Sequence, residues 1–142
     1  MADKDVFWVP TACTMKGYAE HAEGSEGERL VALKNLDHQL EQMSVARSLG
    51  VQIALGTDSG STGVYHGSAI ISELRLLLCA GFSMEGAIKC ASFNNARLLG
   101  LDGKGFIKKG MRADFVAVKG SPSGLPESLR NIPLVHVGER FL

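Results

Sequence analysis

The sequence VQIALGTDSG, residues 51–60, carries the main evidence for the fold of this chain. Four of its first five residues are apolar and two of these are β-branched, which is typical of a strand buried on both faces in a parallel sheet covered by helices. Gly56 then permits a sharp turn, and Thr57 and Asp58 place a hydroxyl and a carboxylate at the carboxyl end of the strand. Ligands and catalytic groups of α/β proteins gather at that end. Asp58 is therefore the first candidate for a functional residue.

A structural role is the alternative for Asp58. An aspartate that follows Gly-Thr is common in turns and at helix N-caps, where its carboxylate accepts backbone N–H bonds without any chemistry. These ten residues by themselves leave both interpretations open.

Length and composition are typical of a soluble globular protein. The 142 residues are enough for one ordinary hydrophobic core, so we expect one domain or a domain with a small appendage. The fraction of hydrophobic residues is 45%, and that of charged residues is 21%. Fifteen basic residues balance fifteen acidic ones without a run of like charge, so we expect neither nucleic acid nor membrane as a partner.

The three cysteines favour a cytoplasmic location. Their number is odd, and Cys13, Cys79 and Cys90 lie in or beside apolar stretches, which is typical of reduced, buried thiols rather than of disulfides. No apolar run has the length of a membrane span, and the N-terminus has no signal-peptide core.

A strand, a helix and a second strand are predicted in the first half of the chain. The apolar run VFWVP, residues 6–10, predicts a buried strand. Residues 13–27 are small and polar, which is typical of a long loop. Apolar residues at spacings of three and four predict an amphipathic helix over residues 28–49, ended by Gly50. With the strand at 51–55 these elements form a βαβ unit.

Helices and then a small β module are predicted after the Asp58 loop. A largely covered helix is expected over residues 68–80, a further helix is capped by Ser83, and a short one follows over 93–99. Glycines become frequent beyond residue 101, and β-like segments are predicted at 106–108, 114–118 and 134–137, with a turn back to 140–142.

The order of motifs along the chain resembles a known family. Five motifs follow one another along the chain: VFWVPT, GTDSG, His66-Gly67 before a helix with SEL, AGFSMEGAIKCASFNNARLLGL, and GFIKKGMRADFVAVKGSP. This order is similar to the C-terminal part of the metal-dependent amidohydrolase superfamily, within it to the imidazolonepropionase-like and Xaa-Pro dipeptidase-like enzymes. The resemblance covers residues 6–142 and is most diagnostic over residues 81–122.

The resemblance implies an α/β fold, a reaction and a cofactor. Residues 1–100 would be the C-terminal fragment of a TIM-type (β/α)8 barrel, with its last two strands and helices, and residues 101–142 would be part of a small β-sandwich. Asp58 matches the aspartate with which the family binds its metal and moves a proton. The implied activity is the hydrolysis of a C–N bond in a small molecule, namely a cyclic amide, amide or dipeptide, by water activated on a divalent metal, which we expect to be zinc.

The chain departs from the family in its metal ligands. The family holds its metals with a His-x-His pair on the first barrel strand, a lysine or other bridging residue on the fourth, and single histidines on the fifth and sixth. A full barrel takes about 250 residues, so those strands are not expected here. The four histidines, His21, His38, His66 and His136, form no HxH or HxxxH pair. We therefore expect the chain to be the C-terminal part of the enzyme and inactive when isolated.

Three further residues are candidates for substrate binding. His66 matches a His-Gly pair that the branch carries at the mouth of its pocket, although an exposed loop histidine is an equal alternative. Tyr18 and His21 could line the same pocket from the predicted loop after the first strand, or they could be ordinary loop residues. Glu73 could support the site without touching substrate, or it could be a capping or solvated residue.

Two other kinds of function remain open. The glycines of the loop over residues 56–63 could bind the phosphate of a nucleotide, although their spacing is neither that of the dinucleotide fingerprint nor that of a P-loop. The chain could also be a non-enzymatic fragment that persists by self-association, because two strands of a parallel sheet leave an edge and apolar helix faces uncovered. We therefore expect a homo-oligomer or association with the missing barrel segments.

Overall fold

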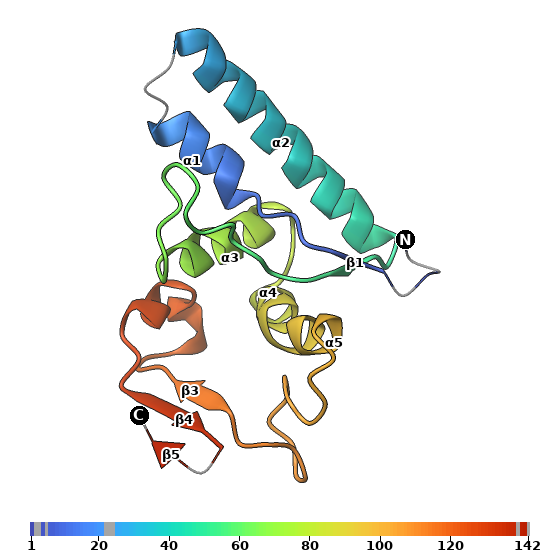
Figure 1. The fold of residues 1–142 in the computed structure, drawn as a ribbon, viewed down its shortest axis with the longest axis vertical. Helices are drawn as coiled ribbons and strands as arrows, with labels where there is room; N and C mark the ends of the chain where they lie inside the picture. The colour runs from blue at the N-terminus through green and yellow to red at the C-terminus, as the bar shows by residue number, and fades with distance from the viewer. Residues whose placement is uncertain (2–3, 5, 22–24, 139, 142) are drawn as a thin grey trace.

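The computed structural model describes residues 1, 4, 6–21, 25–138 and 140–141 (Figure 1). None of the helices in these ranges has both the length and the apolar character needed to span a membrane. The elements in chain order are β1 (Phe7–Trp8), α1 (Cys13–His21), α2 (Glu26–Ser48), β2 (Gln52–Ile53), α3 (Ala69–Cys79), α4 (Met84–Lys89), the π-helical turn η2 (Cys90–Asn94), α5 (Asn95–Leu98), β3 (Phe115–Ala117), the 3-10 turns η3 (Pro122–Gly124) and η4 (Glu127–Arg130), β4 (Leu134–Val137) and β5 (Arg140–Phe141).

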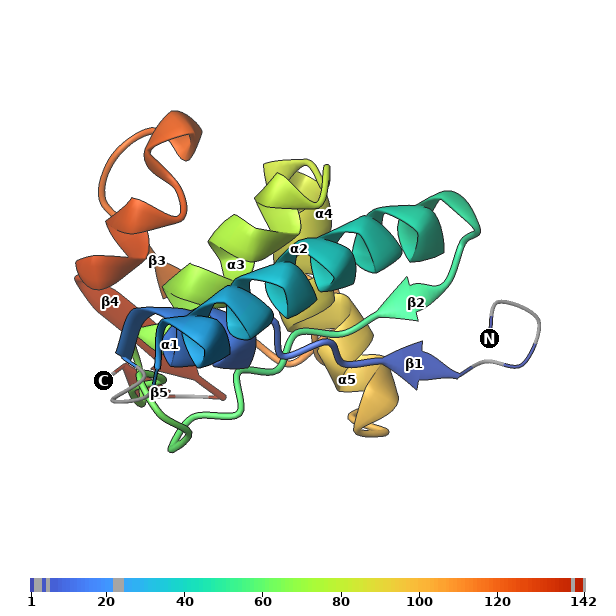
Figure 2. The ribbon, with the colours of Figure 1, turned by 90° about the horizontal axis from the view of Figure 1, so that it is seen from above.

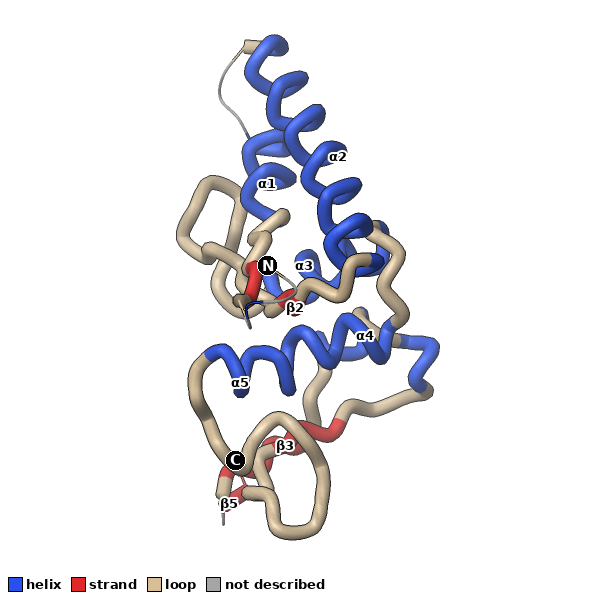
Figure 3. Tube along the Cα trace, turned by 90° about the vertical axis from the view of Figure 1, so that its right-hand side faces the viewer, coloured by secondary structure: helices blue, strands red, loops and turns tan. Residues whose placement is uncertain are grey.

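The predicted βαβ unit is confirmed as two parallel strands joined through helices. Phe7 pairs with Gln52 and Trp8 with Ile53, and the connection between the strands runs through α1 and α2. The strand pair lies between α1 and α2 on one side and α4 and α5 on the other (Figure 3). Seen from above in Figure 2, α2 runs alongside the two strands. Helices therefore cover both faces of the pair, as expected of a parallel sheet.

The strands are shorter and less buried than predicted. Only Phe7–Trp8 and Gln52–Ile53 are paired, and Val6 and Val9 on the first strand remain 42% and 38% exposed. The reason is that β1 has a single hydrogen-bonded neighbour, β2, among the described strands. A strand with one neighbour leaves its other edge and part of its side chains open to solvent.

The prediction of a loop over residues 13–27 was wrong, because α1 occupies Cys13–His21. Residues 22–24 of that segment lie outside the described ranges. The helix has no capping side chain of its own at its start. Instead, the N–H groups of Ala12 and Cys13 donate to the carboxylate of Glu73 in α3, a contact between distant residues that local sequence does not reveal.

Helix α2 confirms the amphipathic prediction and begins two residues earlier than expected. Ser25 and Glu28 form a capping box, in which each side chain bonds to the backbone of the other, and Gly50 follows the helix with a φ of 73°. Leu36 and Met43 of the predicted stripe are buried, whereas Leu33 is exposed. The core lies where α2, β2, α3 and α4 meet, and its members include Met43, Ile53, Leu74, Leu77 and Ala87.

The helices after residue 80 form one continuous segment rather than two. Ser83 caps α4 by accepting from the N–H of Gly86 at 3.0 Å, as predicted, and the helix then passes through η2 into α5 without a break. Two consecutive amide side chains, at the end of the π-helical turn and the start of α5, bond to the backbone of β2 and of the residues just after it. Asn94 donates to the carbonyl of Ile53 at 2.6 Å, and Asn95 donates to that of Leu55 at 2.9 Å. These two bonds fix the helical segment against the backbone of residues 53–55.

The C-terminal part forms an antiparallel sheet in the order β3-β4-β5. This confirms the segments predicted at 114–118, 134–137 and 140–142, as far as residue 141. The strand predicted at 106–108 was wrong, because Phe106 lies in a bend, residues 107–108 have no regular secondary structure, and Ile107 is 91% exposed.

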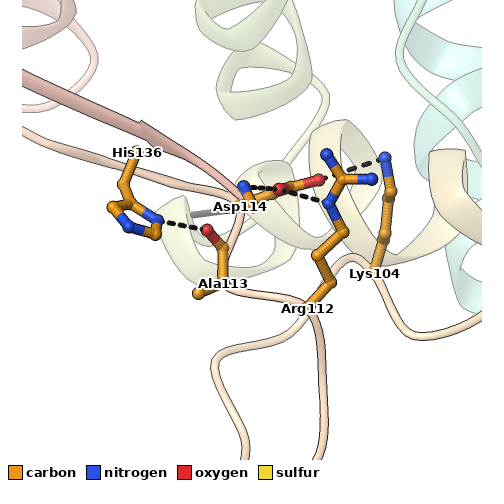
Figure 4. Close-up of polar contacts among 6 residues, drawn as sticks. Lys104, Arg112, Ala113, Asp114 and His136 are labelled. Atoms are coloured by element: carbon orange, nitrogen blue, oxygen red, sulfur yellow. Dashed lines mark hydrogen bonds and ion pairs between the residues drawn. The ribbon is translucent and has the colours of Figure 1, made fainter. Parts of the chain in front are cut away.

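Asp114 joins the turns to the sheet (Figure 4). Its carboxylate accepts from Lys104 Nζ at 3.0 Å, from Arg112 Nε at 2.9 Å and from the N–H of Gly138 at 2.8 Å. Desolvation acts to raise the pKa of Asp114, but these three donors outweigh it and lower that pKa.

Candidate active site

Asp58 follows β2 at the carboxyl end of the strand, after the buried residues Ala54 and Leu55. Its carboxylate is exposed, and Oδ2 accepts hydrogen bonds from Ser61 Oγ at 2.6 Å and from Thr14 Oγ1 at 3.3 Å. The φ of Asp58 is 50°, in the left-handed region that few residues other than glycine adopt. Such backbone strain persists only where the surroundings impose it, and it is frequent at functional sites.

The carboxylate of Asp58 does not cap a helix. The next helix, α3, begins at Ala69, and no backbone N–H of the described residues donates to this side chain. Asp58 instead begins a turn in which its carbonyl accepts from the N–H of Ser61 at 3.2 Å. Since both side-chain contacts go to Oδ2, no described residue bonds to Oδ1.

The loops after β1 and β2 meet at the same edge of the sheet. Cys13 Sγ donates to the carbonyl of Thr57 at 2.9 Å, and Thr14 reaches the carboxylate of Asp58. Burial, followed by the charge of Glu73, raises the pKa of Cys13 from 9.0 to about 12, so the thiol keeps the proton that it donates. Sequence reasoning missed Cys13, Thr14 and Ser61, although the strand-end argument used for Asp58 also applies to the residues after β1.

Glu73 lies beneath these loops and is fully buried. Its two carboxylate oxygens accept from the N–H groups of Ala12 at 3.0 Å and Cys13 at 2.8 Å. Burial raises the pKa of Glu73, although the two backbone N–H groups act in the opposite direction. Of the roles considered for Glu73, the structure shows a cap on the neighbouring helix α1.

Tyr18 and His21 line a cavity of about 1040 Å³ between α1, α2 and the loop that carries Thr62. The ring of His21 also lies edge-on to Tyr65, with centroids 6.1 Å apart. Asp58 is not among the residues that line this cavity. The structure therefore brings Tyr18 and His21 together at one cavity. Asp58 lies outside that cavity, earlier on the loop that carries Thr62.

His66 is exposed in the loop that follows Asp58. Its Nε2 is 3.9 Å from the position that a Cβ on Gly60 would take. The other histidines lie elsewhere, since His38 is exposed on α2 and His136 belongs to β4. Within the described ranges, no three His, Cys, Asp or Glu side chains are placed to hold a metal ion.

A zinc site needs three or four ligands, so the described residues do not form one by themselves. Asp58 nevertheless suits the role of a single ligand, because its carboxylate is exposed and its Oδ1 is not used by any described residue. The described residues therefore offer a metal one candidate ligand, Asp58, and not a complete site.

Part of the backbone of the glycine-rich loop is engaged within the loop itself. The N–H groups of Gly60, Ser61 and Val64 donate within the loop, to the carbonyls of Val64, Asp58 and Ser61 respectively. Phosphate-binding loops need free N–H groups that point toward the ligand. These three N–H groups are therefore not available to a phosphate.

Comparison with solved structures places the fold among known enzymes. The crystal structure of a Xaa-Pro dipeptidase with bound methionine in its active site is similar with a TM-score of 0.83 and 27% sequence identity, over 100% of this chain and 36% of that one. A putative prolidase from Bifidobacterium longum has a TM-score of 0.81 and 27% identity, over 96% of this chain and 35% of that one. The crystal structure of A. niger ochratoxinase has a TM-score of 0.79 and 24% identity, over 99% of this chain and 32% of that one. At this identity the similarity is evidence for the fold only.

The chain is thus a mixed α/β fragment that spans about a third of the length of the solved structures it matches. None of the curated proteins matches it. Residues 18–137 match the model of the amidohydrolase family. Because this match extends over most of the sequence, the chain belongs to the amidohydrolase family.

Proposed function

We propose that this chain is the C-terminal part of a metal-dependent hydrolase of C–N bonds in cyclic amides, amides or dipeptides. Asp58 would be a ligand of the metal, proposed to be zinc, and the group that moves a proton. The observation that carries this proposal is the geometry of Asp58, an exposed carboxylate at the end of β2, in a left-handed conformation, held through only one of its oxygens. Membership of the amidohydrolase family supports it.

The proposal assigns β1 and β2 to the last two strands of a (β/α)8 barrel, and β3 to β5 to a small β-sandwich. The half-open first strand supports this assignment, because Val6 and Val9 are exposed beside an edge that a further strand could occupy. Leu30, Val31 and Leu33 on α2 are exposed as well. We therefore propose that the partner of this chain is the set of missing barrel segments, rather than a second copy.

The chain's own residues would serve the reaction as follows. A divalent metal lowers the pKa of a bound water to near neutrality. Asp58 would be the general base that takes up a proton and the general acid that returns it to the departing amine. Ser61 and Thr14 hold Oδ2, so Oδ1 is the oxygen left for the metal. Tyr18 and His21 on α1, and His66 beyond Asp58, are proposed to contact the substrate.

The test compares the 142-residue chain alone with an enzyme reconstituted from this chain and a polypeptide that supplies the other barrel strands, including a His-x-His strand. Hydrolysis of dipeptides, N-acyl amino acids and cyclic amides is measured with zinc present. We expect no turnover by the chain alone, because one carboxylate cannot replace the missing imidazoles. In the reconstituted enzyme, Asp58→Asn should lower kcat by at least about a thousandfold, since it removes both a ligand and a base.

Asp102→Asn is the matched control, because Asp102 is exposed in the turn after α5 and makes no described contact with the loops at Asp58. It should retain full activity. Turnover by the isolated chain that Asp58→Asn abolishes would refute the incompleteness of the site. Full activity of the reconstituted Asp58→Asn enzyme would refute the role of Asp58.

A further inference from the structure

Glu73 connects α3 to the loop that follows β1. Its side chain is 0% exposed, and it is the charged residue in the buried core of the described chain. Oε1 accepts from the N–H of Ala12 at 3.0 Å, and Oε2 accepts from the N–H of Cys13 at 2.8 Å. These groups begin α1, and the first N–H groups of a helix have no partners within the helix itself. One carboxylate therefore satisfies two consecutive donors at the end of a strand.

The residues that Glu73 holds are also the ones that contact the Asp58 turn. Cys13 Sγ donates to the carbonyl of Thr57 at 2.9 Å, immediately before Asp58. Thr14 Oγ1 donates to the carboxylate of Asp58 at 3.3 Å. Glu73 in α3 is thus connected to the carboxylate of Asp58 through the first turn of α1. The connection consists of hydrogen bonds and of the backbone that joins Cys13 to Thr14 and Thr57 to Asp58.

Both turns on this path are strained. Thr11 has a φ of 49° and Asp58 has a φ of 50°, and these are the non-glycine residues with positive φ among those described. A left-handed conformation costs energy for a residue with a Cβ, so contacts nearby must maintain it. The two N–H groups that Glu73 binds come directly after Thr11, which places the carboxylate where it can hold that turn.

A carboxylate is not required to fill the space that Glu73 occupies. A leucine, methionine or glutamine has a similar volume and does not place a charge in the core, where desolvation is costly. Burial accordingly raises the pKa of Glu73. What the carboxylate provides, and an apolar side chain does not, is a pair of acceptor oxygens that fix two successive N–H groups in one orientation.

We infer that Glu73 is a positioning residue for Asp58. By binding the first N–H groups of α1, it holds Cys13 and Thr14 where they orient the Asp58 turn and its carboxylate. This inference rests on the proposed function, which gives Asp58 its role in the reaction.

The first experiment needs no activity and uses the 142-residue chain. Glu73→Gln leaves one acceptor oxygen for two donors, so amide hydrogen exchange at Ala12 or Cys13, followed by NMR, should become at least about tenfold faster. The ¹³Cγ resonance of Asp58 should shift as well. Thr14→Val, which leaves the Glu73 contacts in place, should shift the Asp58 resonance without changing exchange at Cys13. An unchanged Asp58 resonance in Glu73→Gln would overturn the inference.

The second experiment measures kcat and KM in the reconstituted enzyme. Glu73→Gln should lower kcat by about ten- to a hundredfold at nearly constant KM, because a displaced catalytic group costs rate rather than binding. Leu77→Ala, one turn further along α3 and equally buried, is the control for general destabilisation. It should retain kcat at a temperature where both variants are folded.

Asp58→Asn, measured beside these variants, separates the two proposals. Activity retained in Asp58→Asn overturns the proposed function. Activity lost in Asp58→Asn, with kcat unchanged in Glu73→Gln, overturns the positioning role alone. If Glu73→Gln does not fold, the positioning role is tested with Thr14→Val instead. Thr14→Val should lower kcat at unchanged thermal stability. An unchanged kcat would overturn the inference.

Discussion

Gly17 of α1 lies directly against the carbonyl oxygen of Thr62, so closely that a Cβ on Gly17 would be 2.2 Å from that oxygen. No side chain fits between the helix and the loop at this point. The contact holds the loop that carries Asp58 against α1, in addition to the hydrogen bonds of Cys13 and Thr14.

Gly17→Ala should therefore destabilise the protein, although alanine is the better helix former. The added methyl group must displace either the helix or the Thr62 backbone, and overpacking of this kind costs about 1–3 kcal/mol. Gly27→Ala in α2 is the matched control, because its Cβ would meet only Ser25 Oγ at 3.6 Å. That substitution should stabilise by about 0.4–1 kcal/mol. Urea unfolding of both variants measures the difference, and a neutral Gly17→Ala would show that the loop is not packed as described.

Ser25→Ala should weaken the start of α2. Ser25 accepts from the N–H of Glu28 at 3.4 Å, and the Glu28 carboxylate accepts from the N–H of Ser25 at 2.7 Å. Loss of such a cap costs about 0.5–2 kcal/mol. Ser68→Ala tests the same substitution before α3, where the serine makes no capping bond, and should change stability little. Equal effects of the two substitutions on the thermal midpoint would contradict the capping box.

Thiol labelling should distinguish the three cysteines. Cys79 is exposed, whereas Cys13 and Cys90 are buried. Burial is the largest cause that raises the pKa of Cys13 to about 12 and that of Cys90 to about 11, so neither forms a thiolate at neutral pH. This corrects the prediction that all three thiols are buried. A disulfide reagent should modify Cys79 quickly and the other two only on unfolding. Rapid labelling of a Cys79→Ser variant would contradict this.

Stability should depend on pH through Glu73 in a defined direction. Because burial raises the pKa of this carboxyl above its ordinary value of 4.5, the native state binds the proton more tightly than the unfolded state does. The free energy of unfolding contributed by Glu73 should therefore increase as the pH falls through the raised pKa, and the increase should be complete below 4.5. It should be lost again as the pH rises.

The comparison that isolates this effect is the difference in urea midpoint between the wild-type chain and Glu73→Gln, measured across the acid range. The subtraction is needed because Asp114, whose pKa is lowered, contributes in the opposite direction. A difference that does not change with pH would show that Glu73 titrates as it does in the unfolded chain.

Sequence reasoning succeeded where a local pattern has a single structural outcome. Three elements were predicted from residues adjacent in the chain, and all three are present. The apolar run before Asp58 predicted β2, the leucine spacing predicted α2, and the serine before Met84 predicted the start of α4. It failed where the decisive partner is distant. The polar segment that forms α1 was predicted as a loop, because its start is capped by Glu73, which belongs to another helix.

The sequence alone determined the order of strand, helix and strand, the position of Asp58 after the second strand, and the resemblance to an amidohydrolase, since these follow from residue type and spacing. The tertiary structure alone decided that Thr14, Ser61 and the turn at Asp58 come together, and that a buried glutamate lies behind them. The physical reason is that hydrogen bonds between loops depend on where two strand ends meet in space. The spacing of residues along the chain does not determine which distant segments meet.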